Sequence, residues 1–217
     1  VKEWLYQLLS PEKNVTRSPR SYNSQIGVPL SVWNLDERSE VGLFEAGISE
    51  PGEMEALQSV IQPTIGVFTC LGDAHQENFT SYEQKCLEKL KLFKDAKVLV
   101  YDMDDACVVG CVNRSAFKGE YFAWSRQRRD VPLYIASVEK REAETVVSYI
   151  YKGKEAACSI PFIDEASLAN SVSCLAVCLH LGMSPETIAA RMAVLEPVAM
   201  RLEVKEGRSG CTLINDS

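Results

Sequence analysis

Residues that could bind a metal ion or transfer protons follow two successive apolar runs of this sequence. Glu45 ends the first run, and His75 comes shortly after the second run at 64–70. Lys85 and Lys89 follow on an expected helix. Because ligands bind at the carboxyl ends of parallel strands, we expect Glu45 and His75 to end neighbouring strands, roughly 4.8 Å apart. A carboxylate and an imidazole placed in this way could hold one divalent cation.

The residues alone leave a second interpretation of this pattern open. In that interpretation, Glu45 is a capping acid and His75 is a loop histidine without chemistry. A third apolar run ends in a further group of acids at the same expected edge of the sheet, namely Asp102, Asp104 and Asp105. Spacing does not decide between a metal site and ordinary loop residues.

Composition excludes a general affinity for polyanions. The chain has 23 lysines and arginines against 30 aspartates and glutamates, which gives a net charge of −7. This balance argues against nonspecific binding to nucleic acid or to an anionic membrane. No apolar run approaches the roughly 18 residues of a membrane-spanning helix. We therefore expect a cytoplasmic protein without nucleic-acid or membrane partners.

The eight cysteines are expected to be reduced core residues. Cys158, Cys174 and Cys178 sit among alanine, leucine and valine, as buried thiols do. A zinc site is the alternative, but the spacing and neighbours of the cysteines do not favour it. The sequence therefore predicts neither a disulfide framework nor a structural metal.

Short apolar runs alternate with helical patterns in the first half of the chain. Strand, helix, strand, helix and strand are predicted, in this order, at 41–47, 51–62, 64–70, 81–95 and 97–102. This order is typical of parallel strands joined by right-handed crossovers. Alternating segments between about 121 and 160 predict an antiparallel flap on that sheet. The predicted fold class is α/β, a mostly parallel sheet flanked by helices with a small antiparallel β flap.

Helical patterns return in the last third of the chain. One helix is predicted at 164–182, with Gly182 just past its end. A second is predicted at 184–196, with Ser184 as its cap and Pro185 in its first turn. Two short strands, at 200–207 and 211–216, are expected to close the chain.

Several motifs, taken in order, resemble the central ATPase domain of the Mur ligases, which are ATP-dependent amide ligases of bacterial cell-wall synthesis. That domain has a fold like the P-loop NTPases. The matching positions are Asn23, Ile26-Gly27, Pro29-Leu30, Glu45 with Gly47, Gly52-Glu53-Met54, Pro63 with Gly66-Val67, Ala74-His75, Lys89 and Asn170. The C-terminal segment also resembles the hinge strand of the family. The resemblance therefore extends from one end of the sequence to the other.

Three features depart from the family pattern. Ser49 and Glu50 stand where the family has asparagine and histidine, and Asp102 stands at the asparagine of an Asn-x-Asp-Asp motif. These 217 residues contain no glycine-rich phosphate loop ending in Gly-Lys-Thr. We therefore expect a fragment, with residues 1–211 forming a central domain without its phosphate loop. Residues 212–217 are expected to begin the hinge to a missing C-terminal domain.

The resemblance also implies an activity. Within the family, the likeness is greatest to the ligases that add D-alanyl-D-alanine to UDP-N-acetylmuramoyl-tripeptide through an acyl phosphate, some of which are fused to an alanine racemase. ATP and Mg²⁺ would be the cofactors. The implied roles are Mg²⁺ ligation for Glu45 and His75, catalysis for His75 and a carbamoylated Lys89 that positions the metal, ATP binding for Asn170 and Asp216, and substrate binding for Asn23 and Gln25.

Two alternatives remain at this point. Ligases of the folylpolyglutamate or cyanophycin synthetase type share the same set of site residues, a glutamate, a histidine and a lysine. A noncatalytic scaffold domain without a phosphate loop is the other possibility. His180 lies late in an apolar helix and is expected to be a helix-end residue without a chemical role.

Overall fold

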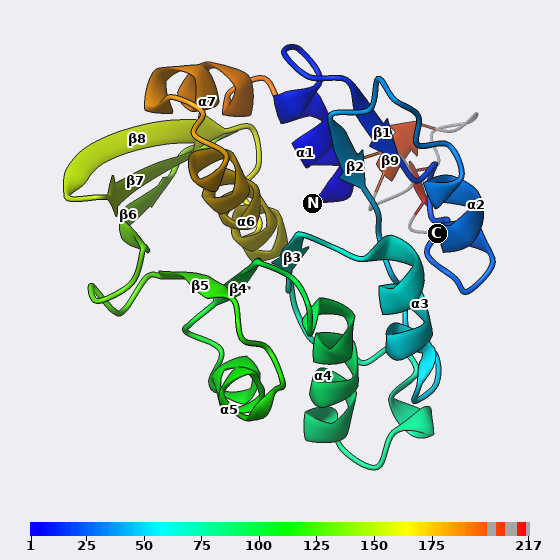
Figure 1. Cartoon of the computed structure of the whole chain (residues 1–217). Helices are drawn as coiled ribbons and strands as arrows, with labels where there is room; N and C mark the ends of the chain where they lie inside the picture. Colours follow the sequence, from blue (N-terminus) through cyan, green and yellow to red (C-terminus); the bar gives the residue numbers. More distant parts are fainter. Residues whose placement is uncertain (199–202, 207–211, 216–217) are drawn as a thin grey trace.

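A single six-stranded sheet forms the centre of the molecule (Figure 1). The computed structural model describes residues 1–198, 203–206 and 212–215, with side chains described for 1–198. The strands lie in chain order across the sheet: β3 (Ile65–Val67), β4 (Val98–Asp102), β5 (Glu120–Ser125), β6 (Leu133–Lys140), β7 (Thr145–Tyr151) and β8 (Lys154–Ile160). Strands β3 to β6 are parallel, and β7 and β8 continue the sheet as antiparallel strands. The predicted parallel sheet with an antiparallel flap is confirmed.

The two strands expected to carry Glu45 and His75 are not neighbours in one sheet. Strand β2 (Val41–Leu43) pairs in parallel with β1 (Val15–Arg17), and these two form a separate small sheet. Within the described residues, β2 makes no ladder with β3. The predicted pairing of these strands is therefore wrong. The segment near 121, predicted to open the flap, is also different, because β5 runs parallel to β4 and β6.

Helices cover both faces of the main sheet (Figure 1). Their bounds are α1 (Lys2–Leu9), α2 (Gly27–Val32), α3 (Glu53–Ile61), α4 (Tyr82–Leu90), α5 (Ala106–Arg114), α6 (Glu165–His180) and α7 (Pro185–Met192), with short 3-10 turns η1 (Gln76–Asn78) and η2 (Lys91–Phe93). The predicted helices appear as α3, α4, α6 and α7. The sequence analysis predicted neither α2 nor α5.

Side-chain oxygens cap several of these helices. The hydroxyl groups of Ser81 and Ser184 accept hydrogen bonds from backbone amides in the first turns of α4 and α7. At the end of α6, Gly182 has a φ of +81°. Its amide bonds the Leu179 carbonyl, and the Met183 amide bonds the Cys178 carbonyl. These two bonds are the Schellman arrangement, which requires a left-handed residue at this place.

Each face of the sheet has its own apolar core. On β4, Val98 and Val100 belong to the core beneath α1, α6 and α7, whereas Leu99 and Tyr101 belong to the core beneath α3, α4 and α5. This alternation is the period of two expected for a strand that is buried on both faces. Five of the seven described cysteines are buried in these cores, and all seven are free thiols.

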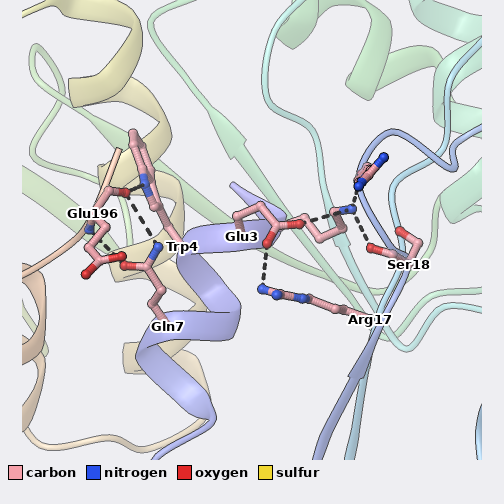
Figure 2. Close-up of polar contacts among 8 residues, drawn as sticks. Glu3, Trp4, Gln7, Arg17, Ser18 and Glu196 are labelled. Atoms are coloured by element: carbon pink, nitrogen blue, oxygen red, sulfur yellow. Dashed lines mark hydrogen bonds and ion pairs between the residues drawn. The ribbon is translucent and has the colours of Figure 1, made fainter. Parts of the chain in front are cut away.

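Helix α1 joins the small sheet to the segment that follows α7 (Figure 2). On one side, Glu3 forms an ion pair with Arg17 at 2.5 Å, next to the end of β1. On the other side, the Trp4 indole nitrogen donates to the Glu196 carbonyl at 2.9 Å. The Glu196 amide donates to the side-chain oxygen of Gln7, also at 2.9 Å. Contacts between residues almost 200 positions apart thus hold the two parts together.

The described part of the C-terminal segment is an antiparallel hairpin of β9 (Glu203–Glu206) and β10 (Thr212–Asn215). The two strands predicted for this segment are confirmed. Asp216, which was predicted to bind ATP, lies outside the described residues. No helix in the described part of the chain is long and apolar enough to cross a membrane.

Candidate active site

The first part of the candidate site is a direct contact between Asn23 and Glu45. The Asn23 amide nitrogen donates to a Glu45 carboxylate oxygen at 3.0 Å. The backbone of Asn23 also accepts a hydrogen bond from the Gly47 amide at 2.8 Å. A β-carbon at Gly47 would lie 3.1 Å from the Asn23 side chain, so glycine permits this close approach. The loop after β1 and the loop after β2 are therefore locked together around Glu45.

His75 lies eight residues after the end of β3, in the loop that leads towards α4. It is exposed and has a φ of +58°, in the left-handed region, and its carbonyl accepts a hydrogen bond from the Asn78 amide. The Asn78 side chain donates to the Ser49 carbonyl at 2.9 Å. This bond connects the loop of His75 to the loop that follows Glu45. The structure thus brings the two loops into contact, although their strands are not paired.

Side chains on one face of helix α4 form hydrogen bonds with the loop that contains His75. The ammonium group of Lys85 is buried and donates to the carbonyl oxygens of Gly72 at 2.7 Å and Ala74 at 2.5 Å. One turn earlier, the Tyr82 hydroxyl bonds the Asp73 carboxylate. One turn later, Lys89 donates to the Cys70 carbonyl at 3.3 Å. These three side chains recur every three or four residues, so they lie on one helix face.

Of the two lysines, Lys89 is the better suited to react as a neutral amine. Burial lowers the pKa of its ammonium group, and the charge of Lys85 lowers this pKa further. Its nitrogen also lies 5.9 Å from the centre of the Phe68 ring. A lowered pKa increases the neutral fraction of an amine, and the neutral amine is the nucleophilic form.

The described residues contain no cluster of three or more histidine, cysteine, aspartate and glutamate side chains that could hold a metal. Mg²⁺, however, keeps several waters and is usually bound through one or two carboxylates together with substrate phosphates. One oxygen of Glu45 bonds Asn23, and within the described residues its other oxygen has no hydrogen-bond partner. An oxygen donor of this kind fits Mg²⁺.

The acids after β4 form a second polar group. Asp105 caps α5 through the Val108 amide. Asp104 accepts bonds from the Ser125 hydroxyl at 2.5 Å and the Arg126 amide at 2.7 Å. Burial, followed by the charges of Asp104 and Asp105, raises the pKa of Asp102 to about 6. Asp104 and Asp105 are thus engaged in structural bonds, and Asp102 is the acid with an altered protonation equilibrium.

A cavity of about 380 Å³ lies between these acids and the first turns of α6. Its lining includes Asp102, Trp124, Glu165 and Ala169. The indole N–H of Trp124 is buried and has no hydrogen-bond partner among the described residues. A buried donor without a partner is costly, and Trp124 is also one of the residues that line the cavity. Asn170, which was predicted to bind ATP, directly follows Ala169.

Two further residues from the sequence analysis lie elsewhere. Gln25, predicted to bind substrate, donates to the Glu53 carbonyl at 3.3 Å, at the start of α3. His180 is the last residue of α6 and packs edge-on against Phe122. It stands at the opposite end of α6 from the cavity.

The sequence analysis missed two features of this site. The buried position of Lys85 was not predicted, although its spacing of four from Lys89 places both lysines on one helix face. The unpartnered Trp124 was not singled out either. Its burial depends on α6, which is distant in the sequence, and no local pattern signals it.

Comparison with known proteins gives consistent results. The Mur ligase middle domain family matches residues 1–178. The chain is 26% identical over 223 aligned residues to UDP-N-acetylmuramoyl-tripeptide–D-alanyl-D-alanine ligase of Bacillus subtilis, and 28% identical to the protein of that name from Borreliella burgdorferi. All of this chain, but only 46% of each relative, is covered. The chain thus spans about half the length of these curated relatives.

Solved structures show the same fold. A crystal structure of MurF from Acinetobacter baumannii superposes with a TM-score of 0.86 at 19% identity, covering 100% of this chain and 47% of that one. MurF ligase from Thermotoga maritima in complex with ADP gives a TM-score of 0.81 at 23% identity, covering 100% of this chain and 50% of that one.

Proposed function

Because this chain belongs to the Mur ligase family through its middle domain, we propose that it is the ATP-binding part of a peptide ligase. The ligase joins D-alanyl-D-alanine to UDP-N-acetylmuramoyl-tripeptide in the cytoplasm. The names of the relatives that match the whole chain support this substrate pair. The structural observation that carries the proposal is the set of hydrogen bonds from Lys85 and Lys89 of α4 to the loop of His75. The pKa of Lys89 is lowered at this position.

The proposal concerns a polypeptide longer than these residues. Residues 1–211 are its central domain, and residues 212–217 begin a hinge towards a further domain. The match covers 46% of the relatives' length, which supports a longer polypeptide.

The reaction gathers negative charge where the tripeptide carboxylate attacks the γ-phosphate of ATP. ADP leaves as the acyl phosphate forms, and the amine of the dipeptide then attacks the acyl carbon and displaces phosphate. Glu45 and His75 are the proposed ligands of Mg²⁺, which when bound would offset charge on the phosphates. Asn23 orients the carboxylate of Glu45 through the 3.0 Å hydrogen bond. Asn23 and Gln25 lie on the segment proposed to face the substrate.

Lys89 is proposed to act as a carbamate. An amine must be neutral to react with carbon dioxide, and burial favours the neutral form by lowering the pKa of Lys89. The product is an anion that can position a cation. Lys85 donates to two carbonyl oxygens of the loop of His75 and holds that loop in place.

The nucleotide is proposed to occupy the cavity beside α6. Asn170, which follows the lining residue Ala169, is the proposed contact to the base, and the Thermotoga relative was solved with ADP. Asp216 is proposed to approach the nucleotide from the hinge.

The complete polypeptide tests this function directly. Purified enzyme is incubated with Mg-ATP, UDP-N-acetylmuramoyl-tripeptide and D-alanyl-D-alanine, and both phosphate and the ligated product are measured. We expect one phosphate per product, with little release when the dipeptide is omitted or replaced by L-alanyl-L-alanine. Turnover only with a folate and glutamate would establish the alternative ligase type. Binding of nucleotide without any turnover would indicate a noncatalytic domain.

The carbamate has its own test. Lys89→Ala in the complete enzyme should lower turnover by orders of magnitude, and a small carboxylate such as acetate should restore part of it. Lys94→Ala, a change of another lysine just beyond α4, is the matched control and should leave turnover unchanged. Equal loss in both variants, or no rescue, would contradict the proposed role of Lys89.

A further inference from the structure

Among the described residues, five of the eleven exposed large apolar side chains fall within residues 22–35, in helix α2 and its flanking segments. Ile26 is 74% exposed, Leu30 58% and Trp33 88%. Spacings of four and three residues place these side chains on one face of the helix. Tyr22 and Leu35, on either side of the helix, are also exposed. Single exposed apolar residues are ordinary, but a contiguous group marks a contact surface. We call Ile26, Leu30 and Trp33 the α2 face.

The opposite side of α2 is already packed. Gly27, Val28 and Ser31 are buried, and Val28 belongs to the core shared with α3. Gly27 also allows the Tyr22 backbone to approach, since a β-carbon there would lie 3.0 Å from the Tyr22 α-carbon. The exposed residues therefore cannot turn inward without displacing this packing.

The sequence of α2 is apolar on all sides. Between Ile26 and Trp33 it contains one proline and one serine but no charged residue. A helix of this kind is typically buried all round. In Figure 1, α2 lies at the margin of the molecule, with α3 on its inner side. The helix thus has the composition of a buried helix and the position of a surface helix.

The α2 face also lies beside the candidate active site. Asn23, which bonds Glu45, is three residues before Ile26. The Gln25 side chain reaches the Glu53 carbonyl at the start of α3. A body that covered the α2 face would therefore stand next to the loops of Asn23 and Glu45.

From this placement we infer that the α2 face is an interdomain contact, covered by an apolar surface of another domain of the same polypeptide. The inference rests on the proposed function, in which the complete ligase is longer than these residues. The relatives carry more than half of their length outside the matched region, so they have chain enough to form such a domain. A second copy of this chain is the competing occupant, and the experiment below separates the two.

Trp33 reports directly on what covers this face. The other two tryptophans, Trp4 and Trp124, are 5% and 3% exposed, so Trp33 dominates quenching by acrylamide in these 217 residues. The contribution of Trp33 is obtained as the difference between wild type and Trp33→Phe, in the 217-residue chain and in the complete polypeptide. We expect its quenching constant to fall severalfold in the complete polypeptide, with a blue shift of its emission.

Ile26→Asp tests the contact without damaging the helix. Ile26 immediately precedes α2 and is 74% exposed, so an aspartate there meets solvent and not the packed side of the helix. In the complete polypeptide this variant should restore the quenching of Trp33 and increase proteolytic cleavage between domains. In the 217-residue chain it should leave the melting temperature unchanged. The matched control is Val194→Asp, at a residue that is 72% exposed on another surface, and it should change neither readout.

Three outcomes would overturn the inference. In the first, Trp33 is quenched equally in both lengths of chain. In the second, sedimentation shows a dimer of the complete polypeptide that Ile26→Asp dissociates. In the third, the complete polypeptide has no further domain. Because quenching does not depend on turnover, an active enzyme with an exposed Trp33 would refute this contact alone. A covered Trp33 in an inactive enzyme would refute only the proposed function.

Discussion

The ammonium group of Lys85 donates a 2.5 Å hydrogen bond to the carbonyl of Ala74, the residue immediately before His75. Lys85 is 1% exposed, and its other partner is the Gly72 carbonyl. Two backbone carbonyl oxygens therefore accept hydrogen bonds from a buried ammonium group. The loop cannot move away without leaving that group buried and unpaired. The conformation of the loop of His75 depends on a residue on α4.

We predict that Lys85→Met loosens this loop. Loss of two charged hydrogen bonds should cost about 1–3 kcal/mol of stability, and hydrogen exchange at residues 70–79 should become faster. Lys94→Met, a change of a partly exposed lysine, should affect neither measurement. Unchanged exchange at 70–79 in Lys85→Met would show that packing alone fixes the loop.

Removal of either proposed metal ligand should disable the complete enzyme. We expect Glu45→Ala and His75→Ala to lower turnover by at least about 100-fold while the melting temperature stays near that of wild type, since both side chains are partly or fully exposed. His180→Ala and Glu50→Ala are the matched controls and should retain activity. Turnover near wild type in Glu45→Ala would exclude its role in metal binding.

Asp102 should make stability depend on pH. Its pKa is raised from 3.8 to about 6 in the folded chain, so folding favours the protonated form. Stability is therefore lost as pH rises from about 4 through 6. The shift corresponds to roughly 3 kcal/mol, which solvent screening of this half-buried group reduces to about 1–2 kcal/mol.

The variant Asp102→Asn isolates that effect. Its side-chain oxygen can still accept from the Asp104 amide, which now bonds Asp102 at 2.8 Å. Urea unfolding at pH 7.5 should show the variant to be more stable than wild type by about 1–2 kcal/mol. At pH 4 the two proteins should have nearly equal stability. A constant difference across this range would contradict the assignment.

A polypeptide of only these 217 residues should bind Mg-ATP weakly or not at all. A glycine-rich loop and its lysine supply most phosphate contacts in such folds, and these residues include no Gly-Lys-Thr motif. Calorimetric titration measures the affinity. Micromolar binding would show that the cavity beside α6 holds the nucleotide without such a loop.

The cysteines should differ sharply in reactivity. Cys70 and Cys107 are exposed, whereas the other five described cysteines are buried. Burial raises the pKa of Cys158 and Cys174 to about 12, which suppresses the reactive thiolate. In a Cys211→Ser background, a thiol reagent should modify two groups in the native chain and all seven after denaturation. Stoichiometric zinc in the purified protein would contradict this prediction.

Much of the fold could be predicted because its signals are local. The first four positions of β4 are apolar because the strand is buried on both faces there. Ser81, Ser184 and Gly182 have side chains or backbone freedom suited to helix ends, and all three occupy those positions. Helix α5 was missed because its short pattern follows the acids of 102–105 and looks like the end of a loop.

Strand partners could not be predicted in the same way. The runs that precede Glu45 and His75 are neighbours in sequence, but β2 pairs with β1, whereas β3 pairs with β4. A strand's own residues specify that it is extended, but not which edge it joins, since every backbone offers the same donors and acceptors. The loops still meet, through Asn78 and Ser49.

The sequence by itself determined the α/β class and the helix caps, because these depend on local periodicity, and its motifs made Glu45, His75 and Lys89 the candidate site residues. Only the tertiary structure decided that Asn23 bonds Glu45, that Lys85 holds the loop of His75, and that burial lowers the pKa of Lys89. It also left the α2 face uncovered. Burial and partnership depend on contacts between distant segments, which a one-dimensional pattern does not contain.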